Sequence, residues 1–174
     1  MVNNKDRPVQ IIWAGKPYPE DESAIKTFNE LHFVSNFYPN VAVLTGYELA
    51  LSKALKDGSG LWLNTPVVTR EASGTSGMTA AMNGSINCST YDGWIPEFAK
   101  NGINAFTLPV AEGSDINTQD LIHLYEVLEN VVIPTYYDNR EKWDKMILQS
   151  MNDVGDFFNS DRMAIEYYEK LYAD

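Results

Sequence analysis

The sequence of 174 residues contains one cysteine and two histidines, and its 13 basic residues are outnumbered by 24 acidic ones. The lone cysteine, Cys88, cannot form an internal disulfide, which fits a reducing compartment. His32 and His123 stand far apart without ligand partners at metal spacing, so no zinc site is expected. The net charge of −11 argues against nucleic acids and anionic membranes as partners.

Long hydrophobic runs are missing as well. No apolar stretch approaches the roughly 18 residues of a membrane span, and residues 1–8 lack the apolar core of a signal peptide. These absences predict a cytoplasmic protein. Hydrophobic residues make up 44% of the chain and charged residues 21%, as in folded globular proteins, and the length predicts a single domain over residues 1–174.

Short apolar runs alternate with helical patterns through about residue 115, and the remainder of the chain is almost wholly helical. This alternation is typical of a parallel α/β sheet, here with a helical extension over about 117–174. Pro134 is predicted to end the first helix of that extension. Strands are predicted at residues 9–13, 41–44, 61–63, 86–90 and 105–109. The strands at 9–13 and 86–90 are expected to be buried. Helices are predicted at about 21–31, 47–55, 73–83 and 117–133, and two more begin at about 140 and 162.

Aromatic and methionine residues recur at helical spacing near the C-terminus. Core packing is the simplest interpretation of both stripes. The stripes are formed by Trp143, Met146, Ile147, Met151, Val154 and Phe158 in one predicted helix, and by Ile165, Tyr168, Leu171 and Tyr172 in the next.

One segment, Glu71–Met78, stands apart chemically. It places two glycines and three hydroxyl residues between a predicted strand and a short helix. Backbone N–H groups in such a turn, with a helix start behind them, form an anion cradle. Glu71 at the edge of the turn can accept hydrogen bonds from sugar hydroxyls. From its residue types alone the signal is weak, because a loop rich in serine and glycine is usually only a turn.

The stretch from Leu61 to Gly84 closely resembles the α-glucan (glycogen and maltodextrin) phosphorylase family, in LWLNTP, in EASGTSGM and in AAMNG. The likeness extends over most of the chain. Further matching pieces, in order, are Ala14-Gly15-Lys16, Tyr47, Asp92-Gly93-Trp94, Glu129-Asn130, Ile133-Pro134, Tyr137-Asp138, Trp143, Ser150, Phe158, Arg162-Met163 and Tyr167.

This resemblance implies a Rossmann-like, doubly wound parallel sheet, the C-terminal domain of a two-domain glycosyltransferase of the GT-B type. The active site of such an enzyme lies in the cleft between its two domains. The resemblance therefore implies that this chain, which lacks the N-terminal domain, is incomplete and inactive on its own. By the family pattern, Glu71 is the catalytic residue, and it binds the glucosyl unit together with Ser73 and Gly74. The same pattern implies that Gly74, Thr75, Ser76 and Gly77 bind phosphate. Tyr47 is expected near the cofactor. Lys16, after the first strand, is either a contact to donor phosphate or a surface lysine.

The sequence departs from the family at Thr79. The family has a lysine there that forms a Schiff base with pyridoxal phosphate, and threonine has no amine for this bond. Three interpretations stay open: a phosphorylase site with a natural or engineered lesion, noncovalent pyridoxal phosphate, or a synthase-like relative that uses a nucleotide sugar. Glu71 and Thr79 have the spacing at which related retaining glycosyltransferases carry a glutamate and a variable residue.

The function that the resemblance implies is conversion of an α-glucan and phosphate to glucose 1-phosphate with retention of configuration. The alternatives are glucan synthesis from a nucleotide sugar and a noncatalytic glucan-binding module. Homo-oligomerisation is left open. Asp92 and Trp94 either line an acceptor cleft or close a turn, Cys88 is expected in the core, and Glu20-Asp21-Glu22 is a solvated helix start.

Overall fold

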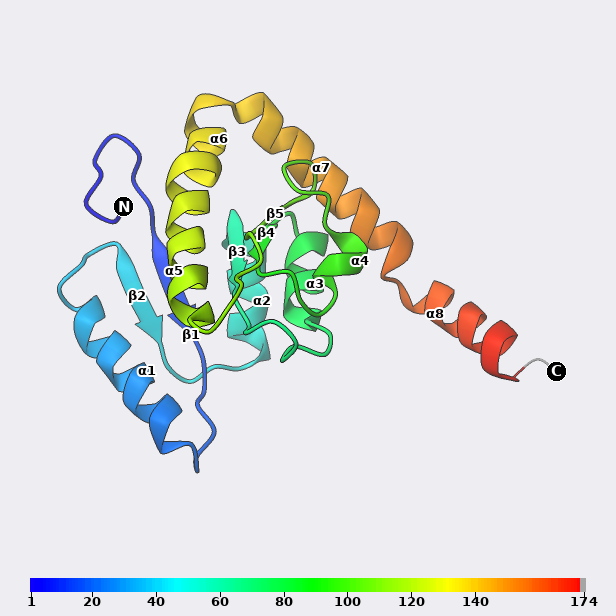
Figure 1. The fold of residues 1–174 in the computed structure, drawn as a ribbon, viewed down its shortest axis with the longest axis horizontal. Helices are drawn as coiled ribbons and strands as arrows, with labels where there is room; N and C mark the ends of the chain where they lie inside the picture. The colour runs from blue at the N-terminus through cyan, green and yellow to red at the C-terminus, as the bar shows by residue number, and fades with distance from the viewer. Residues whose placement is uncertain (173–174) are drawn as a thin grey trace. The chain divides into compact units, whose positions relative to one another are not determined.

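A computed structural model describes residues 1–172 as an α/β structure with two parallel sheets (Figure 1). The predicted α/β class and the parallel pairing are therefore confirmed. The chain divides into two compact units, Met1–Leu55 and Lys56–Asp174, and each is described by itself. One domain with one doubly wound sheet stays a prediction.

The first unit is built around two strands and one helix. Strands β1 (Ile11–Ala14) and β2 (Val41–Leu44) pair in parallel, and helix α1 (Glu22–Ser35) connects them and packs on β2. The carboxylate of Asp21 accepts the N–H of Ala24 at 2.9 Å, which fixes the start of α1. Figure 1 shows α1 running alongside the two strands.

The prediction that β1 is a buried strand is wrong for this structure. Ile12 is 50% exposed and Trp13 is 41% exposed. Ile12 and Trp13 are neighbours and point to opposite faces of the strand, so neither face of β1 is fully covered within this two-stranded unit.

The second unit contains a three-stranded sheet in the order β3 (Leu61–Asn64), β4 (Ile86–Ser89), β5 (Ala105–Thr107). All four residues of β4 are buried, as predicted, because β4 is the central strand of the three. Helix α3 (Thr75–Met82) connects β3 to β4, and α4 (Ile95–Phe98) connects β4 to β5. Helix α2 (Leu49–Gly58) spans the boundary between the two units.

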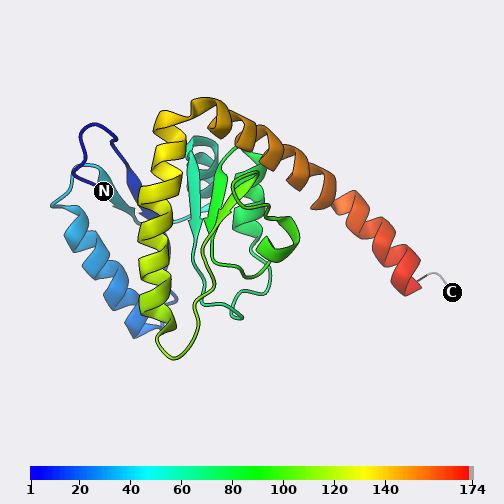
Figure 2. The same cartoon turned by 45° about the horizontal axis from the view of Figure 1, so that its top comes forward.

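One side of this sheet is covered by α3, α4 and α7 (Arg140–Phe157), as both ribbon views show (Figures 1 and 2). The contact between α3 and α7 closes the core there. Its buried members are Ala81, Trp94, Ile95, Phe98, Ala105 and Val154, with Met78, Ala99 and Phe158 packed against them.

The helical extension runs without a break through Pro134, contrary to the prediction that this proline ends a helix. A π turn at Leu128–Val132 precedes Pro134. Pro134 then lies in the first turn of α6 (Ile133–Asp138), where the N–H group that proline lacks is not required. The break falls later, at Asn139, which caps α7 by accepting the N–H of Lys142. The remaining elements are α5 (Ile116–Val127), η1 (Leu128–Val132), α6 (Ile133–Asp138), α8 (Ser160–Tyr167) and η2 (Tyr168–Tyr172).

Core packing explains part of the apolar stripe of α7, although Met151 is 40% exposed, contrary to the prediction. It fails for the last stripe, which runs from α8 into η2. Trp143, Met146 and Val154 of α7 are at most 2% exposed. No residue of α8 or η2 is buried, and Tyr168 and Leu171 of η2 are each 67% exposed. Helix α8 follows the end of α7 and lies beyond the sheet-covering helices of its unit (Figure 2). Among residues 1–172 no helix is both long and apolar enough to span a membrane.

Candidate functional site

The candidate site lies where two loops meet at one edge of the three-stranded sheet. Strands β3 and β4 are parallel neighbours, so the segments that follow their carboxyl ends emerge side by side. The segment after β3 contains Glu71–Met78, and the segment after β4 contains Asp92-Gly93-Trp94. Ligands of parallel α/β sheets bind at this edge.

The start of α3 offers unpaired hydrogen-bond donors. Its N-cap residue, Gly74, has φ +108°, a conformation that a side chain disfavours, and no side chain caps the helix. Among the described residues, the backbone N–H groups of Thr75 and Ser76 have no acceptor. Together with the helix dipole, these donors suit an anion.

Glu71 lies at the edge of these donors. Its own N–H donates to Asp92 at 2.9 Å, while its carboxylate has no hydrogen bond or ion pair with any described residue. Ser73 is exposed, and its carbonyl accepts the N–H of Trp94 at 2.7 Å. Among residues 1–172, the site thus combines a carboxylate, a hydroxyl and backbone donors without hydrogen-bond partners, all between Glu71 and Ser76.

The indole of Trp94 forms the floor of the loop. A Cβ atom added to Gly74 would lie 2.9 Å from the Trp94 ring, and one added to Gly77 would lie 2.7 Å from the Asn87 amide oxygen and 2.9 Å from the indole nitrogen. Asn87 also donates to the Gly77 carbonyl at 3.0 Å. Glycine is therefore required at both positions, because Trp94 and Asn87 leave no room for a side chain.

Gly77→Ala is expected to lower the free energy of unfolding by about 1–3 kcal/mol, because the buried groups at this position cannot move aside easily. Gly155→Ala is the matched control, since Gly155 lies in α7 with no atom near its added Cβ. That change is expected to raise the same quantity by about 0.5–1 kcal/mol. Chemical denaturation measures both, and equal effects would contradict the packing argument.

Thr79 lies in α3, three residues before its last residue, and its side chain folds back on its own helix. The hydroxyl donates to the carbonyl of Thr75, at 3.0 Å, or of Ser76, at 3.1 Å. Between Glu71 and Ala99 the sequence contains no lysine. The described loop therefore supplies no amine of its own to an aldehyde.

Lys16 and Tyr47 belong to the first unit, and so stay outside the group of residues that the structure brings together in the second. Lys16 is exposed and lines a hollow between the end of β1 and the start of α1. The Tyr47 hydroxyl donates to Ser52 at 2.8 Å. Their roles at a donor site stay predictions.

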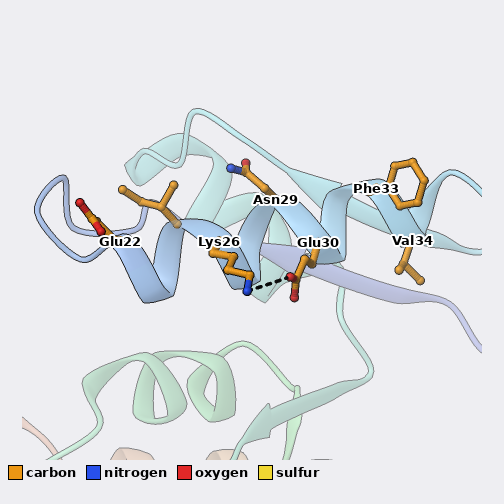
Figure 3. Close-up of a pocket in the computed structure, with 7 residues that line it drawn as sticks. Glu22, Lys26, Asn29, Glu30, Phe33 and Val34 are labelled. Carbon is orange, nitrogen blue, oxygen red and sulfur yellow. Dashed lines mark ion pairs between the residues drawn. The ribbon is translucent and has the colours of Figure 1, made fainter.

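A second hollow of the first unit follows one face of α1 and is lined by α1 residues alone (Figure 3). The ion pair between Lys26 and Glu30, at 3.9 Å, is exposed to solvent and so contributes little to stability. Phe33 and Val34 line its other end.

The remaining candidate groups of the sequence are Cys88 and the possible metal ligands. Cys88 is fully buried on β4, as predicted, and burial raises the pKa of its thiol to about 12. Within residues 1–172 no three or more histidine, cysteine or acidic side chains gather as a metal site would require.

Comparison with known proteins gives this site a context. No protein-family model matches the chain. It is 39% identical to maltodextrin phosphorylase of Thermococcus litoralis over 180 residues, covering 99% of this chain and 22% of that protein. It is 38% identical to glycogen phosphorylase of Aquifex aeolicus over 183 residues, covering 99% of this chain and 26% of that protein.

The chain is homologous to the glycogen and maltodextrin phosphorylases. It spans about a fifth to a third of the length of the curated relatives it matches, so it corresponds to a domain-sized part of a phosphorylase. An uncharacterized protein of Methanocaldococcus jannaschii is 45% identical over 172 residues, covering 97% of this chain and 32% of that protein.

Within this phosphorylase-related chain, the structure brings Glu71, Ser73 and the start of α3 together. It also adds Asp92 and Trp94, for which the sequence had left two interpretations open. Both close the turn after β4, and both hold the Glu71 loop. The sequence signal for them was the Asp-Gly-Trp triplet directly after a predicted strand.

Proposed function

We propose that this chain is the donor-binding domain of a retaining α-glucan glycosyltransferase of the phosphorylase type. In this proposal it is the C-terminal, Rossmann-like half of a GT-B enzyme, which acts in the cytoplasm with a second domain supplied by residues outside this sequence. The reaction converts an α-glucan and phosphate to glucose 1-phosphate, with retained configuration.

The observation that carries the proposal is the pairing of two unlike binding groups on one loop. The free N–H groups of Thr75 and Ser76 suit the oxygens of a phosphate, and the free carboxylate of Glu71 suits sugar hydroxyls. A sugar phosphate presents both chemistries on adjacent atoms. The homology to phosphorylases supports the same assignment.

In this proposal the residues of the chain bind and orient the donor. The backbone donors at the start of α3 hold the phosphoryl group through aligned dipoles, which offset part of the chain's net charge of −11. Glu71 and the Ser73 hydroxyl fix the glucosyl ring beside it. Fixing both parts brings the anomeric carbon and the phosphate oxygen to a reactive distance.

Covalently bound pyridoxal phosphate does not fit this site. Thr79 has no amine, and its hydroxyl already donates to backbone carbonyls of α3. We therefore assign no step to this cofactor. The same observation favours a second candidate, a synthase-like enzyme in which the diphosphate of a nucleotide sugar occupies the start of α3.

Calorimetric titration with glucose 1-phosphate, inorganic phosphate, ADP-glucose and UDP-glucose tests the proposal. We expect glucose 1-phosphate to bind. The change Glu71→Gln should raise its dissociation constant about 10-fold or more, because a charged hydrogen-bond acceptor is lost. Binding of inorganic phosphate should stay within about 2-fold, because backbone groups of α3 hold it.

The other outcomes separate the candidates. Tighter binding of a nucleotide sugar than of glucose 1-phosphate would favour the synthase-like enzyme. Binding of maltodextrin without any donor would favour a noncatalytic glucan-binding module. Failure of inorganic phosphate and all three glucosyl donors to bind, or an unchanged affinity for glucose 1-phosphate in Glu71→Gln, would contradict the donor site.

A further inference from the structure

The turn after β4 holds the loop that carries Glu71. One oxygen of the Asp92 carboxylate, Oδ2, accepts the N–H of Arg70 at 3.1 Å and the N–H of Glu71 at 2.9 Å. Asp92 follows the central strand of the sheet, while Arg70 and Glu71 follow the neighbouring strand. The contact thus joins two segments that are 21 residues apart at Glu71.

A second contact holds the loop on the other side of Glu71. The N–H of Trp94 donates to the Ser73 carbonyl at 2.7 Å. A Cβ atom on Gly93 would overlap that carbonyl oxygen and would lie 2.8 Å from Cγ of Glu71. The side chain of Glu71 therefore lies against the Gly93 backbone, between the hydrogen bond to Asp92 and the hydrogen bond from Trp94.

The backbone just before these contacts is strained. Thr69 has φ +76°, a region that β-branched residues rarely occupy. Such a conformation typically costs about 1–3 kcal/mol and persists only where the surroundings impose it. The two bonds from Asp92 to the following residues are such a constraint.

We propose that Asp92 is a positioning residue, which aims the Glu71 carboxylate at the sugar of the donor by holding the N–H groups of Arg70 and Glu71. This inference rests on the proposed function. Hydrogen bonds from these N–H groups also hold the pKa of the Asp92 carboxyl below its ordinary value, so the residue is charged at neutral pH.

The position of Asp92 separates the two halves of the site. Asp92 contacts the loop on the Glu71 side, whereas the free donors of Thr75 and Ser76 belong to α3. Loss of Asp92 should therefore release the sugar-binding carboxylate and leave the phosphate-binding donors in place. A purely structural role would weaken both halves together.

The test compares Asp92→Ala, Asp92→Asn and Asp144→Asn at pH 7, in the full chain. Asp144 is the control, because its pair with Arg140 on α7 is exposed. We expect Asp92→Ala to weaken glucose 1-phosphate binding about 10-fold and inorganic phosphate binding less than about 2-fold. Asp92→Asn, which keeps one oxygen as acceptor, should restore part of that loss, and Asp144→Asn should change neither ligand.

A ligand-free readout separates this inference from the proposed function. In two-dimensional ¹H–¹⁵N spectra, both Asp92 variants should shift the amide signals of Arg70 and Glu71, and Asp144→Asn should not. Unchanged amide signals would overturn the inference, as would equal losses of both ligands. Shifted amides in a chain whose unmodified form binds no ligand would overturn the proposed function while leaving the contact to Asp92 established.

Discussion

Trp94→Ala is expected to lower the free energy of unfolding by about 3–5 kcal/mol, the range for removing a buried aromatic side chain. Trp94 is 2% exposed, stacks on Phe98 with ring centroids 4.2 Å apart, and meets Phe158 edge to face at 5.2 Å. It also lies against Gly74 and Gly77. The change opens a cavity in the core and removes the floor of the candidate site, so donor binding should be lost as well.

Two further variants make this result specific. Trp94→Phe should cost less than about 2 kcal/mol. It keeps an aromatic ring in the core and removes an indole N–H that is buried with no partner among residues 1–172. Tyr167→Ala should cost less than about 0.5 kcal/mol, since Tyr167 is 53% exposed. Urea denaturation measures all three. A cost for Trp94→Ala close to that of Tyr167→Ala would contradict the packing described for the loop.

Thr79→Lys is expected to create covalent attachment of pyridoxal phosphate where the unmodified chain has none. The lysine amine condenses with the aldehyde, and borohydride reduction makes the bond permanent. The helix should tolerate the change, because lysine favours helices more than threonine does. The measurement is mass spectrometry of tryptic peptides after reduction.

The sequence supplies an internal control for this experiment. Trypsin cuts after Arg70 and Lys100, and residues 71–99 contain no lysine. A label between those cuts therefore arises at position 79 and cannot come from the other lysines of the chain. Labelling confined to other peptides in Thr79→Lys would mean that the pocket does not accept the cofactor, and would favour the nucleotide-sugar candidate.

The local pattern was enough to predict most elements of the fold. Val41–Leu44 is an apolar run bounded by Asn40 and the Thr45-Gly46 turn, and the strand has these bounds. Gly84 was predicted to end α3, and it does so with φ +86°. Pro134 was misleading, because a π turn before it lets the helix continue. Such a turn leaves no mark in the apolar spacing.

The candidate site was only partly predictable for a similar reason. Glycines and hydroxyl residues before a helix indicate an anion-binding turn from their types alone. The contact between Asp92 and the N–H groups of Arg70 and Glu71 has no such signal, because every non-proline residue carries an N–H group. It follows only once β3 and β4 are known to be parallel neighbours.

The burial of Cys88 makes the chain its own stability reporter. The thiol lies in the central strand with no exposed surface, and its raised pKa, about 12, keeps it protonated at neutral pH. Alkylating reagents attack the thiolate, so they reach this sulfur only when the strand separates from its neighbours. Because the chain contains one cysteine, the rate of thiol alkylation reports the opening of this strand without an engineered cysteine or a dye. With fast alkylation the rate equals the opening rate, and with slow alkylation it follows the population of the open form.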